Sequence, residues 1–364
     1  MAFASSAELN RGTQIALVGG IGSGKTTEML LTHRVLSRHE DAVNIFVDLA
    51  DYADLNETNT GAILATIGMR LYSLQTKTGK APIKELTSAH TKLRELAFGK
   101  TKWVDPREVE NYYDPDQDLE PVDVPGVMRL RFPALRRQVK ELRELLVAIA
   151  APLLERDAQI TLLVDGLDRL IKPERFREFA EQDLQALRTT KMTAIVVAPL
   201  LLWYDKSRFL QDYFDLVKHI PAAAANPNDS AFLREVLERR GALELMAAGE
   251  ISRIAKHSGG VLRDLLALTR SAAEGAYRDD EDRIGRGHVT AAIKQLGNRY
   301  LVGLGQTQKR LLNRLSDKGS FPIDDPSARE LLVNRQVLEY FGHGREFFAV
   351  HPALSLVLRR QKGE

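Results

Sequence analysis

The chain has no cysteine among its 364 residues, which excludes disulfides, thiolate metal sites and thiol catalysis. It also lacks a long hydrophobic run. The longest apolar stretch, Ala194–Tyr204, is too short to cross a bilayer and favours a buried strand that runs into its loop. Met1–Leu9 has no charged-then-apolar leader pattern. We therefore expect a soluble, cytoplasmic protein without a membrane partner.

An excess of charge of one sign is absent as well. The 51 basic and 49 acidic residues leave a net charge of +2, so composition predicts no strong field toward nucleic acid or membranes, and any basic patch must be local. The eight histidines show no metal-ligand spacing. The length of 364 residues is large for one core and predicts two or three domains.

A complete phosphate loop is the strongest motif present. The apolar run Ile15–Val18 precedes Gly-Gly-Ile-Gly-Ser-Gly-Lys-Thr at 19–26, which matches G-x-x-x-x-G-K-[ST], and a helical pattern follows. In such a loop the backbone N–H groups bind phosphates, Lys25 reaches the β- and γ-phosphates, and the Thr26 hydroxyl ligates Mg²⁺. The helix N-terminus adds partial positive charge. The expected nucleotide contacts are Gly19, Gly20, Gly22, Ser23, Gly24, Lys25, Thr26 and Thr27.

Short aliphatic runs separated by helical stretches predict the fold class. The runs are Ile15–Val18, Val43–Leu49, Ile160–Val164, Thr193–Val197 and Leu216–Ile220. Their alternation with helices is typical of an α/β protein with a doubly wound, parallel, five-stranded sheet.

The interval between the second and third runs is unusually wide. It contains helical patterns near Thr60–Leu74 and Pro133–Glu155, and between them Thr101–Gly126, with eight acidic residues and four prolines. Such a segment cannot form a regular buried element and predicts a surface insertion. Two interpretations stay open, a solvated excursion and a docking surface for a basic partner.

The third run ends in acidic residues. Asp165 follows the apolar residues 160–164, and Asp168 comes three positions later. Ligands of open parallel sheets collect at the carboxyl ends of strands, so Asp165 is expected to hold Mg²⁺ together with Thr26. Asp168 is then placed to orient or deprotonate the attacking water. Arg169 is interpreted as a solvated helix residue, with a charge clamp on a neighbouring subunit's phosphate as the alternative.

The second half of the chain changes character. From Asn226 to about Gly297, apolar residues recur at three- and four-residue steps without a strand pattern, which predicts a helical subdomain. Beyond Tyr300, two helical patterns precede two short apolar runs joined by Gly342–Arg345, and a last helix follows Pro352. Helices followed by a glycine-tipped hairpin are typical of a winged helix-turn-helix.

These motifs together resemble the STAND and origin-recognition branches of the AAA+-related P-loop ATPases. The segment Asp165-Gly166-Leu167-Asp168 resembles the magnesium-binding strand end of the STAND branch, where an ordinary AAA+ protein has a glutamate in place of Gly166. Residues 258–266 resemble the sensor 2 segment of the helical lid, which implies that Arg263 reports the γ-phosphate. A winged helix follows that lid in the same families.

The chain departs from the family pattern in two places. The fourth run ends in Ala198-Pro199-Leu200, without the Asn, Thr or Arg of a sensor 1 residue. The segment before Gly19 is short for the adenine-recognition element of many AAA+ proteins. Base specificity therefore stays open, although ATP is the usual ligand of the family.

The resemblance implies three domains, a P-loop NTPase core at 1–225 with an insertion at about 77–130, a helical lid at 226–298, and a winged helix at 299–364. The implied function is a slow ATPase that binds ATP or ADP with Mg²⁺ and repositions the lid and winged helix. Nucleotide is expected to clamp these two parts against the core, and hydrolysis to release them. The implied role is regulatory or in defence, with a nucleotide-dependent homo-oligomer or a protein partner. Catalysis would fall to Lys25, Asp168 and Arg263.

Two other functions stay open. A DNA-binding initiator or loader would use Arg329, Arg335 and Arg345 on duplex DNA, against seven acidic residues in 300–364. A phosphotransferase acting on a metabolite is the third class, and the predicted winged helix argues against it.

Overall fold

The computed structural model describes residues 11–39, 42–49, 60–76, 84–98, 138–170, 173–222, 231–342 and 345–363. The chain forms two compact units. The first unit contains the described residues up to Leu17, from Thr26 to Leu202 and from Lys206 to Lys218. The second unit contains Val18–Lys25, Trp203–Asp205 and the described residues from His219 onward. The acidic segment Thr101–Gly126 lies outside the described residues.

The first unit is built on a five-stranded sheet in the order β2-β3-β4-β1-β5. The strands are β1 (Gln14–Val18), β2 (Ala42–Asp48), β3 (Gln159–Asp165), β4 (Thr193–Ala198) and β5 (Leu216–His219). Strand β3 pairs in parallel with both β2 and β4. Every residue of β1 and β4 is buried, as expected of strands covered on both faces. The prediction of a five-stranded α/β sheet is confirmed, and each predicted run is a strand.

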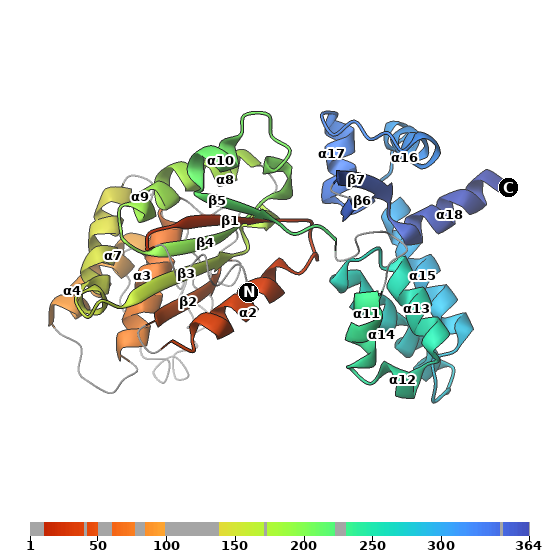
Figure 1. Ribbon diagram of the computed structural model, residues 1–364, viewed down its shortest axis with the longest axis horizontal. Helices are drawn as coiled ribbons and strands as arrows, with labels where there is room; N and C mark the ends of the chain where they lie inside the picture. Colours follow the sequence, from red (N-terminus) through yellow and green to blue (C-terminus); the bar gives the residue numbers. More distant parts are fainter. Residues whose placement is uncertain are drawn as a thin grey trace, which may run out of the picture. The chain divides into compact units, whose positions relative to one another are not determined.

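Helices flank this sheet (Figure 1). They are α2 (Lys25–Leu36), α3 (Ala62–Thr76), α4 (Lys84–Phe98), α7 (Val139–Leu154), α8 (Pro173–Phe179), the π-helical η3 (Ala180–Leu184), α9 (Gln185–Arg188) and α10 (Phe209–Tyr213). Helices α3, α4 and α7 pack against one another. Helix α4 lies inside the segment expected to be an insertion, and it buries Leu86, Ala89, Leu93 and Ala97 at three- and four-residue steps. That part of the insertion is thus a packed helix.

A buried carboxylate fixes the start of α3. Asp183 in η3 is fully buried, and its oxygens accept hydrogen bonds from the N–H groups of Gly61 at 2.7 Å and Ile63 at 3.0 Å. These are N–H groups that a helix N-terminus cannot pair internally. Asp183 therefore caps α3 from a segment about 120 residues away in the chain.

Helices make up the first part of the second unit. They are α11 (Ala231–Glu238), α12 (Ala242–Leu245), α13 (Ala248–His257), α14 (Leu262–Arg278) and α15 (Arg286–Leu301). Within the described residues 231–301, extended pairing is limited to one isolated bridge between Met246 and Ile284. The predicted helical character of this segment is confirmed.

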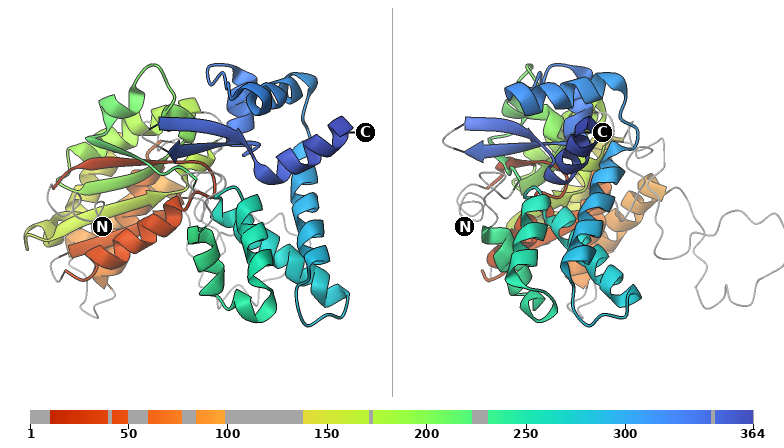
Figure 2. Two further views of the ribbon diagram at one scale, coloured as in Figure 1. Left: turned by 45° about the vertical axis from the view of Figure 1, so that its right-hand side comes forward. Right: turned by 90° about the vertical axis from the view of Figure 1, so that its right-hand side faces the viewer.

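The end of the chain forms helices and a hairpin. The elements are α16 (Gln306–Lys318), α17 (Pro326–Val333), the antiparallel strands β6 (Val337–Gly342) and β7 (Arg345–Val350), and α18 (Pro352–Gly363). The hairpin stands out as a two-stranded ribbon in Figure 2. This is the element order expected of a winged helix, and assignment to that fold stays a prediction. No described helix has both the length and the apolar character that crossing a bilayer requires.

A buried polar cluster joins α14 to the hairpin segment. Asp264 is 3 % exposed and accepts hydrogen bonds from the Tyr300 hydroxyl at 2.6 Å and the Arg335 guanidinium at 3.0 Å. The imidazole of His351, also buried, lies 3.3 Å from the same carboxylate. A buried charge this well paired holds α14, α15 and the start of β6 in one arrangement.

Candidate nucleotide-binding site

The glycine-rich loop connects the end of β1 with the start of α2. Gly22 and Gly24 have φ angles of +86° and +103°, a region where residues with side chains are strained. At Gly19, a Cβ atom would lie 2.2 Å from the Ile220 carbonyl oxygen, so this position has no room for a side chain. The glycines of the motif are therefore required by backbone shape and close approach.

Lys25 is turned toward its own loop. Its ammonium donates hydrogen bonds to the carbonyl oxygens of Gly19 at 2.8 Å and Gly20 at 2.9 Å, and the residue is 4 % exposed. The Ser23 hydroxyl is buried and has no hydrogen-bond partner among the described residues. The loop thus holds a buried ammonium and an unused hydroxyl, which are groups that a phosphate can bind.

The predicted metal ligands meet in the first unit. The Thr26 hydroxyl donates to Asp165 Oδ2 at 2.7 Å, and the Gly166 N–H donates to Asp165 Oδ1 at 2.7 Å. Burial raises the pKa of the Asp165 carboxyl, and the negative charges of Asp168 and Asp48 add to this effect, while the two hydrogen bonds oppose it. A neighbouring cation would therefore be favourable here, because it would stabilise the ionised carboxylate.

A third aspartate at this sheet edge was not singled out in the sequence. Asp48 ends β2 and is in register with Asp165 at the end of β3. Its carboxylate forms an ion pair with Arg169 at 3.2 Å. Asp168 lies in the short helix η2 (Leu167–Arg169) and is half-buried. An acidic residue at the end of the second apolar run was the available signal for Asp48.

The described residues contain no group of three or more His, Cys, Asp or Glu side chains arranged to hold a metal ion. Magnesium in nucleotide sites is bound through one or two carboxylates together with substrate phosphates and water. Asp165 and the Thr26 hydroxyl, already in contact, fit that smaller ligand set.

The predicted sensor residue lies next to the loop within the second unit. Helix α14 begins at Leu262, and a Cβ atom at Gly22 would be 2.8 Å from the Val261 side chain and 3.1 Å from Arg263 Cβ. The Arg263 side chain is exposed. Thr27 is exposed in the first turn of α2. The structure thus brings Arg263, more than 230 residues from the loop in sequence, to the loop itself.

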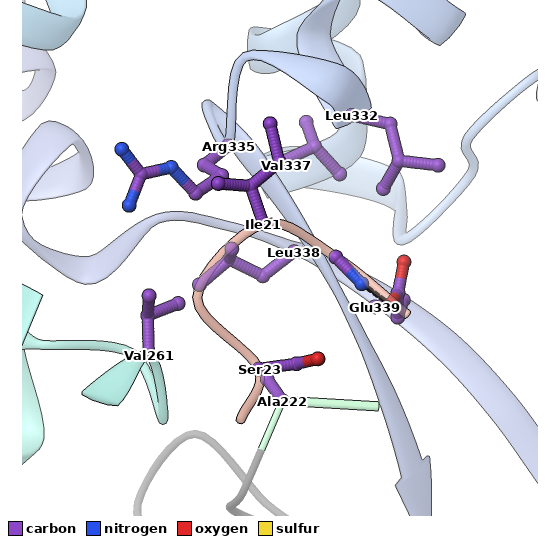
Figure 3. Close-up of a pocket in the computed structure, with 10 residues that line it drawn as sticks. Ile21, Ser23, Ala222, Val261, Leu332, Arg335, Val337, Leu338 and Glu339 are labelled. Carbon is purple, nitrogen blue, oxygen red and sulfur yellow. Dashed lines mark hydrogen bonds between the residues drawn. The ribbon is translucent and has the colours of Figure 1, made fainter. Parts of the chain in front are cut away.

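Strand β6 also contacts the loop, and sequence reasoning missed this. The Gly20 N–H donates to Glu339 Oε1 at 3.1 Å, and Glu339 is 4 % exposed. Figure 3 shows this carboxylate beside the loop segment that carries Ile21 and Ser23. No local pattern marks Glu339, because its partner is 319 residues away.

The arginines considered for DNA contact have different surroundings. Arg335 pairs with Asp264 and its guanidinium lies 5.9 Å from the centre of the Tyr300 ring. The Arg329 side chain donates to the Ile323 carbonyl oxygen at 3.0 Å. Arg345 is exposed. Two of the three are therefore engaged within the second unit.

No protein-family model matches the chain, and no curated protein sequence is significantly similar to it. Solved structures do match over nearly the whole length. Cdc6p from Pyrobaculum aerophilum has 14 % identity and a TM-score of 0.42, with 96 % of this chain and 88 % of that chain covered. Orc1 from Aeropyrum pernix, solved in complex with DNA, has 16 % identity and a TM-score of 0.43 over 96 % and 87 %. RuvB from Thermotoga maritima, a Holliday junction branch migration motor, has 14 % identity and a TM-score of 0.42 over 99 % and 90 %.

At these identities and TM-scores the matches are a likeness in fold. The assignment to the STAND branch stays a prediction. At such identities function must be argued from the residues of this chain. Its strand order, the glycine-rich loop that follows β1 and the aspartate that ends β3 identify the fold as that of a P-loop NTPase.

Proposed function

We propose that this chain binds ATP with Mg²⁺ and hydrolyses it slowly. The observation that carries the proposal is the 2.7 Å hydrogen bond between the Thr26 hydroxyl and Asp165. Thr26 directly follows Lys25 in the phosphate loop, so the bond brings the strand-end carboxylate to the residue next to the loop's cation. A hydroxyl and a carboxylate in this relation to a phosphate loop are the protein ligands that Mg²⁺ has in P-loop NTPases.

Each residue has a distinct role in this proposal. The loop N–H groups and Lys25 bind the phosphates, with Lys25 exchanging its loop carbonyls for phosphate oxygens. Thr26 and Asp165 hold Mg²⁺, which neutralises charge that develops on the phosphoryl oxygens. Asp168, half-buried and three residues from Asp165, orients the attacking water and accepts its proton.

The proposed output is a change of conformation in the second unit. Arg263 at the start of α14 is close enough to Gly22 to respond to what the loop binds. Helix α14 is in turn joined to the hairpin segment through Asp264 and Arg335. Nucleotide state would then reposition the helical lid and the C-terminal segment, which is the behaviour of a molecular switch.

The test is calorimetric titration of wild type and Lys25→Ala with ATP and Mg²⁺. We expect Lys25→Ala to abolish binding, because it removes the point charge that the loop aims at the phosphates. Lys294→Ala, which removes an exposed lysine of α15, is the matched control and should bind like wild type. Equal affinity of Lys25→Ala and Lys294→Ala would refute the site.

A DNA-binding initiator or loader is the second candidate, and one observation favours it. Arg310, Arg314 and Lys318 are exposed and recur every four residues on α16, so they form a basic stripe on one helix face. Salt-dependent binding to duplex DNA tests this function. Replacing all three by alanine should lower the slope of log affinity against log salt by about 3 if each residue neutralises one phosphate. No binding of wild type at low salt would exclude it.

A further inference from the structure

The carboxylate of Glu339 contacts the phosphate loop. A negatively charged side chain is unexpected there, because such a loop binds anionic ligands. Its Oε1 accepts the Gly20 N–H at 3.1 Å, whereas its Oε2 has no hydrogen-bond partner among the described residues. Leaving a buried carboxylate oxygen unpaired is costly. In this position Glu339 does what an anionic ligand of the loop does, because it accepts from a loop N–H group.

The carboxylate is held there by the hairpin and its neighbours. His219 Nε2 lies 3.4 Å from Glu339 Oε1, and His219 Nδ1 lies 3.5 Å from Glu346 Oε1 on the paired strand β7. Trp203 stacks on His219 and donates its indole N–H to Glu346 at 2.8 Å. The stacked pair of Trp203 and His219 therefore contacts both acidic side chains of the hairpin.

The backbone and apolar side chains fix β6 at the same place. The Ala222 N–H lies 3.4 Å from the Glu339 carbonyl oxygen. Val261, Leu338 and Tyr340 form a buried cluster with Ala222, and the Tyr340 hydroxyl donates to the Gly259 carbonyl oxygen at 2.8 Å. The strand is thus docked by packing on both sides of Glu339.

Little space is left between the loop and the strand. The cavity whose lining includes Gly20, Ser23, Leu338, Glu339 and Arg335 has a volume of about 10 Å³, which is room for one water molecule. The Ser23 hydroxyl in this cavity has no partner among the described residues. A phosphate group does not fit into this cavity while β6 stays in place, and the Glu339 charge would repel it. The guanidinium of Arg335 on the lining is already paired with Asp264.

We propose that Glu339 is an internal competitor for the phosphate loop, so that docking of the β6–β7 hairpin and binding of a nucleoside triphosphate exclude each other. The inference rests on the proposed function of the loop. It assigns a direction to the switch, since nucleotide releases the hairpin. The sequence-based expectation had the opposite sense, with nucleotide clamping the C-terminal segment.

The first experiment measures ATP affinity by calorimetry for wild type, Glu339→Gln and Glu330→Gln. Glu339→Gln removes the competing charge and keeps the shape, and we expect it to bind about tenfold more tightly than wild type. Glu330→Gln removes one exposed charge from helix α17 of the same unit, outside the hairpin, so it should bind like wild type. Thermal unfolding of all three proteins checks that they are folded.

The outcomes separate this inference from the proposed function. If Lys25→Ala fails to bind while wild type and Glu339→Gln bind equally, the site is correct and Glu339 does not compete. An equal gain in Glu339→Gln and Glu330→Gln would also overturn the inference, since net charge alone would explain it. If neither wild type nor Glu339→Gln binds ATP, the proposed function itself fails.

A second measurement follows the hairpin directly. The chain has two tryptophans, so Trp103→Phe leaves Trp203 as the single indole that reports on the hairpin. A non-hydrolysable ATP analogue should shift the Trp203 emission, because release of β7 removes the bond to Glu346. The same protein with Lys25→Ala should show no shift. An unchanged emission at nucleotide concentrations that saturate the loop would overturn the inference.

Discussion

Asp165 and Asp168 have different roles in the proposed chemistry, and single substitutions distinguish these roles. Asp168→Asn should keep ATP and Mg²⁺ binding, because Asp165 and Thr26 remain in contact. Its turnover should fall by about 100-fold or more, since the group that handles the water is lost. Calorimetry measures the retained binding, and steady-state hydrolysis measures the lost turnover. Wild-type turnover in Asp168→Asn would assign the catalytic role to another residue.

The protonation of Asp165 gives the site a pH dependence. Burial raises the pKa of this carboxyl above its ordinary value near 4, and only the ionised form ligates Mg²⁺. Magnesium-dependent ATP affinity should therefore be complete at neutral pH and decline as pH falls, beginning at a higher pH than a solvent-exposed aspartate would produce. Titrations of wild type and Asp165→Asn with and without Mg²⁺ between about pH 7.5 and about 5 separate this effect from protonation of the nucleotide's own phosphates. A pH-independent magnesium effect over that range would contradict it.

At the scale of single elements, the start of α3 depends on one side chain. Asp183→Ala leaves the N–H groups of Gly61 and Ile63 buried and unpaired, and we expect it to lower the free energy of unfolding by about 2–4 kcal/mol. Asp212→Ala removes an exposed aspartate from α10 and should stay within about 0.5 kcal/mol of wild type. Urea denaturation measures the free energy of unfolding of both variants. Similar values for the two would show that Asp183 does not stabilise the start of α3.

Two glycines of helix α15 make a matched pair with opposite expectations. A Cβ atom at Gly297 would lie 2.4 Å from the Ala353 carbonyl oxygen on α18, whereas nothing lies within 4 Å of one at Gly287. Gly297→Ala should therefore destabilise the protein by about 1–3 kcal/mol despite a better helix propensity. Gly287→Ala should stabilise it by up to about 1 kcal/mol. Urea denaturation decides, and a stabilising Gly297→Ala would show that α15 and α18 can separate freely.

Elements were more predictable from this sequence than contacts were. The five strands follow from aliphatic runs, and the loop follows from spacing, because both are local patterns. The π-helical η3 and its carboxylate cap on α3 were not predicted, since a cap supplied from 120 residues away leaves no local pattern. Glu339 is the same case in the site, where strand alternation reports which side chains are buried but not what they bind.

Across the chain as a whole, nucleotide binding at the loop has to be transmitted to the C-terminal segment. Arg263→Ala should bind nucleotide nearly as well as wild type, because the loop and Lys25 are intact, but it should break the link through α14. Hydrogen exchange in α18, which packs on α15 outside the hairpin, should respond to a non-hydrolysable ATP analogue in wild type and much less in the variant. Identical responses would make Arg263 a residue of packing only.

The inward-facing Lys25 has a consequence for the kinetics of the protein. A loop whose ammonium is bonded to its own carbonyls, and whose Gly20 N–H is taken by Glu339, must rearrange before nucleotide can enter. The observed association rate should then stop rising with nucleotide concentration and reach a plateau set by the opening rate. Affinity would likewise be reduced by the fraction of molecules that are closed. The opening rate of the loop would then limit how quickly the protein binds nucleotide after the nucleotide concentration rises.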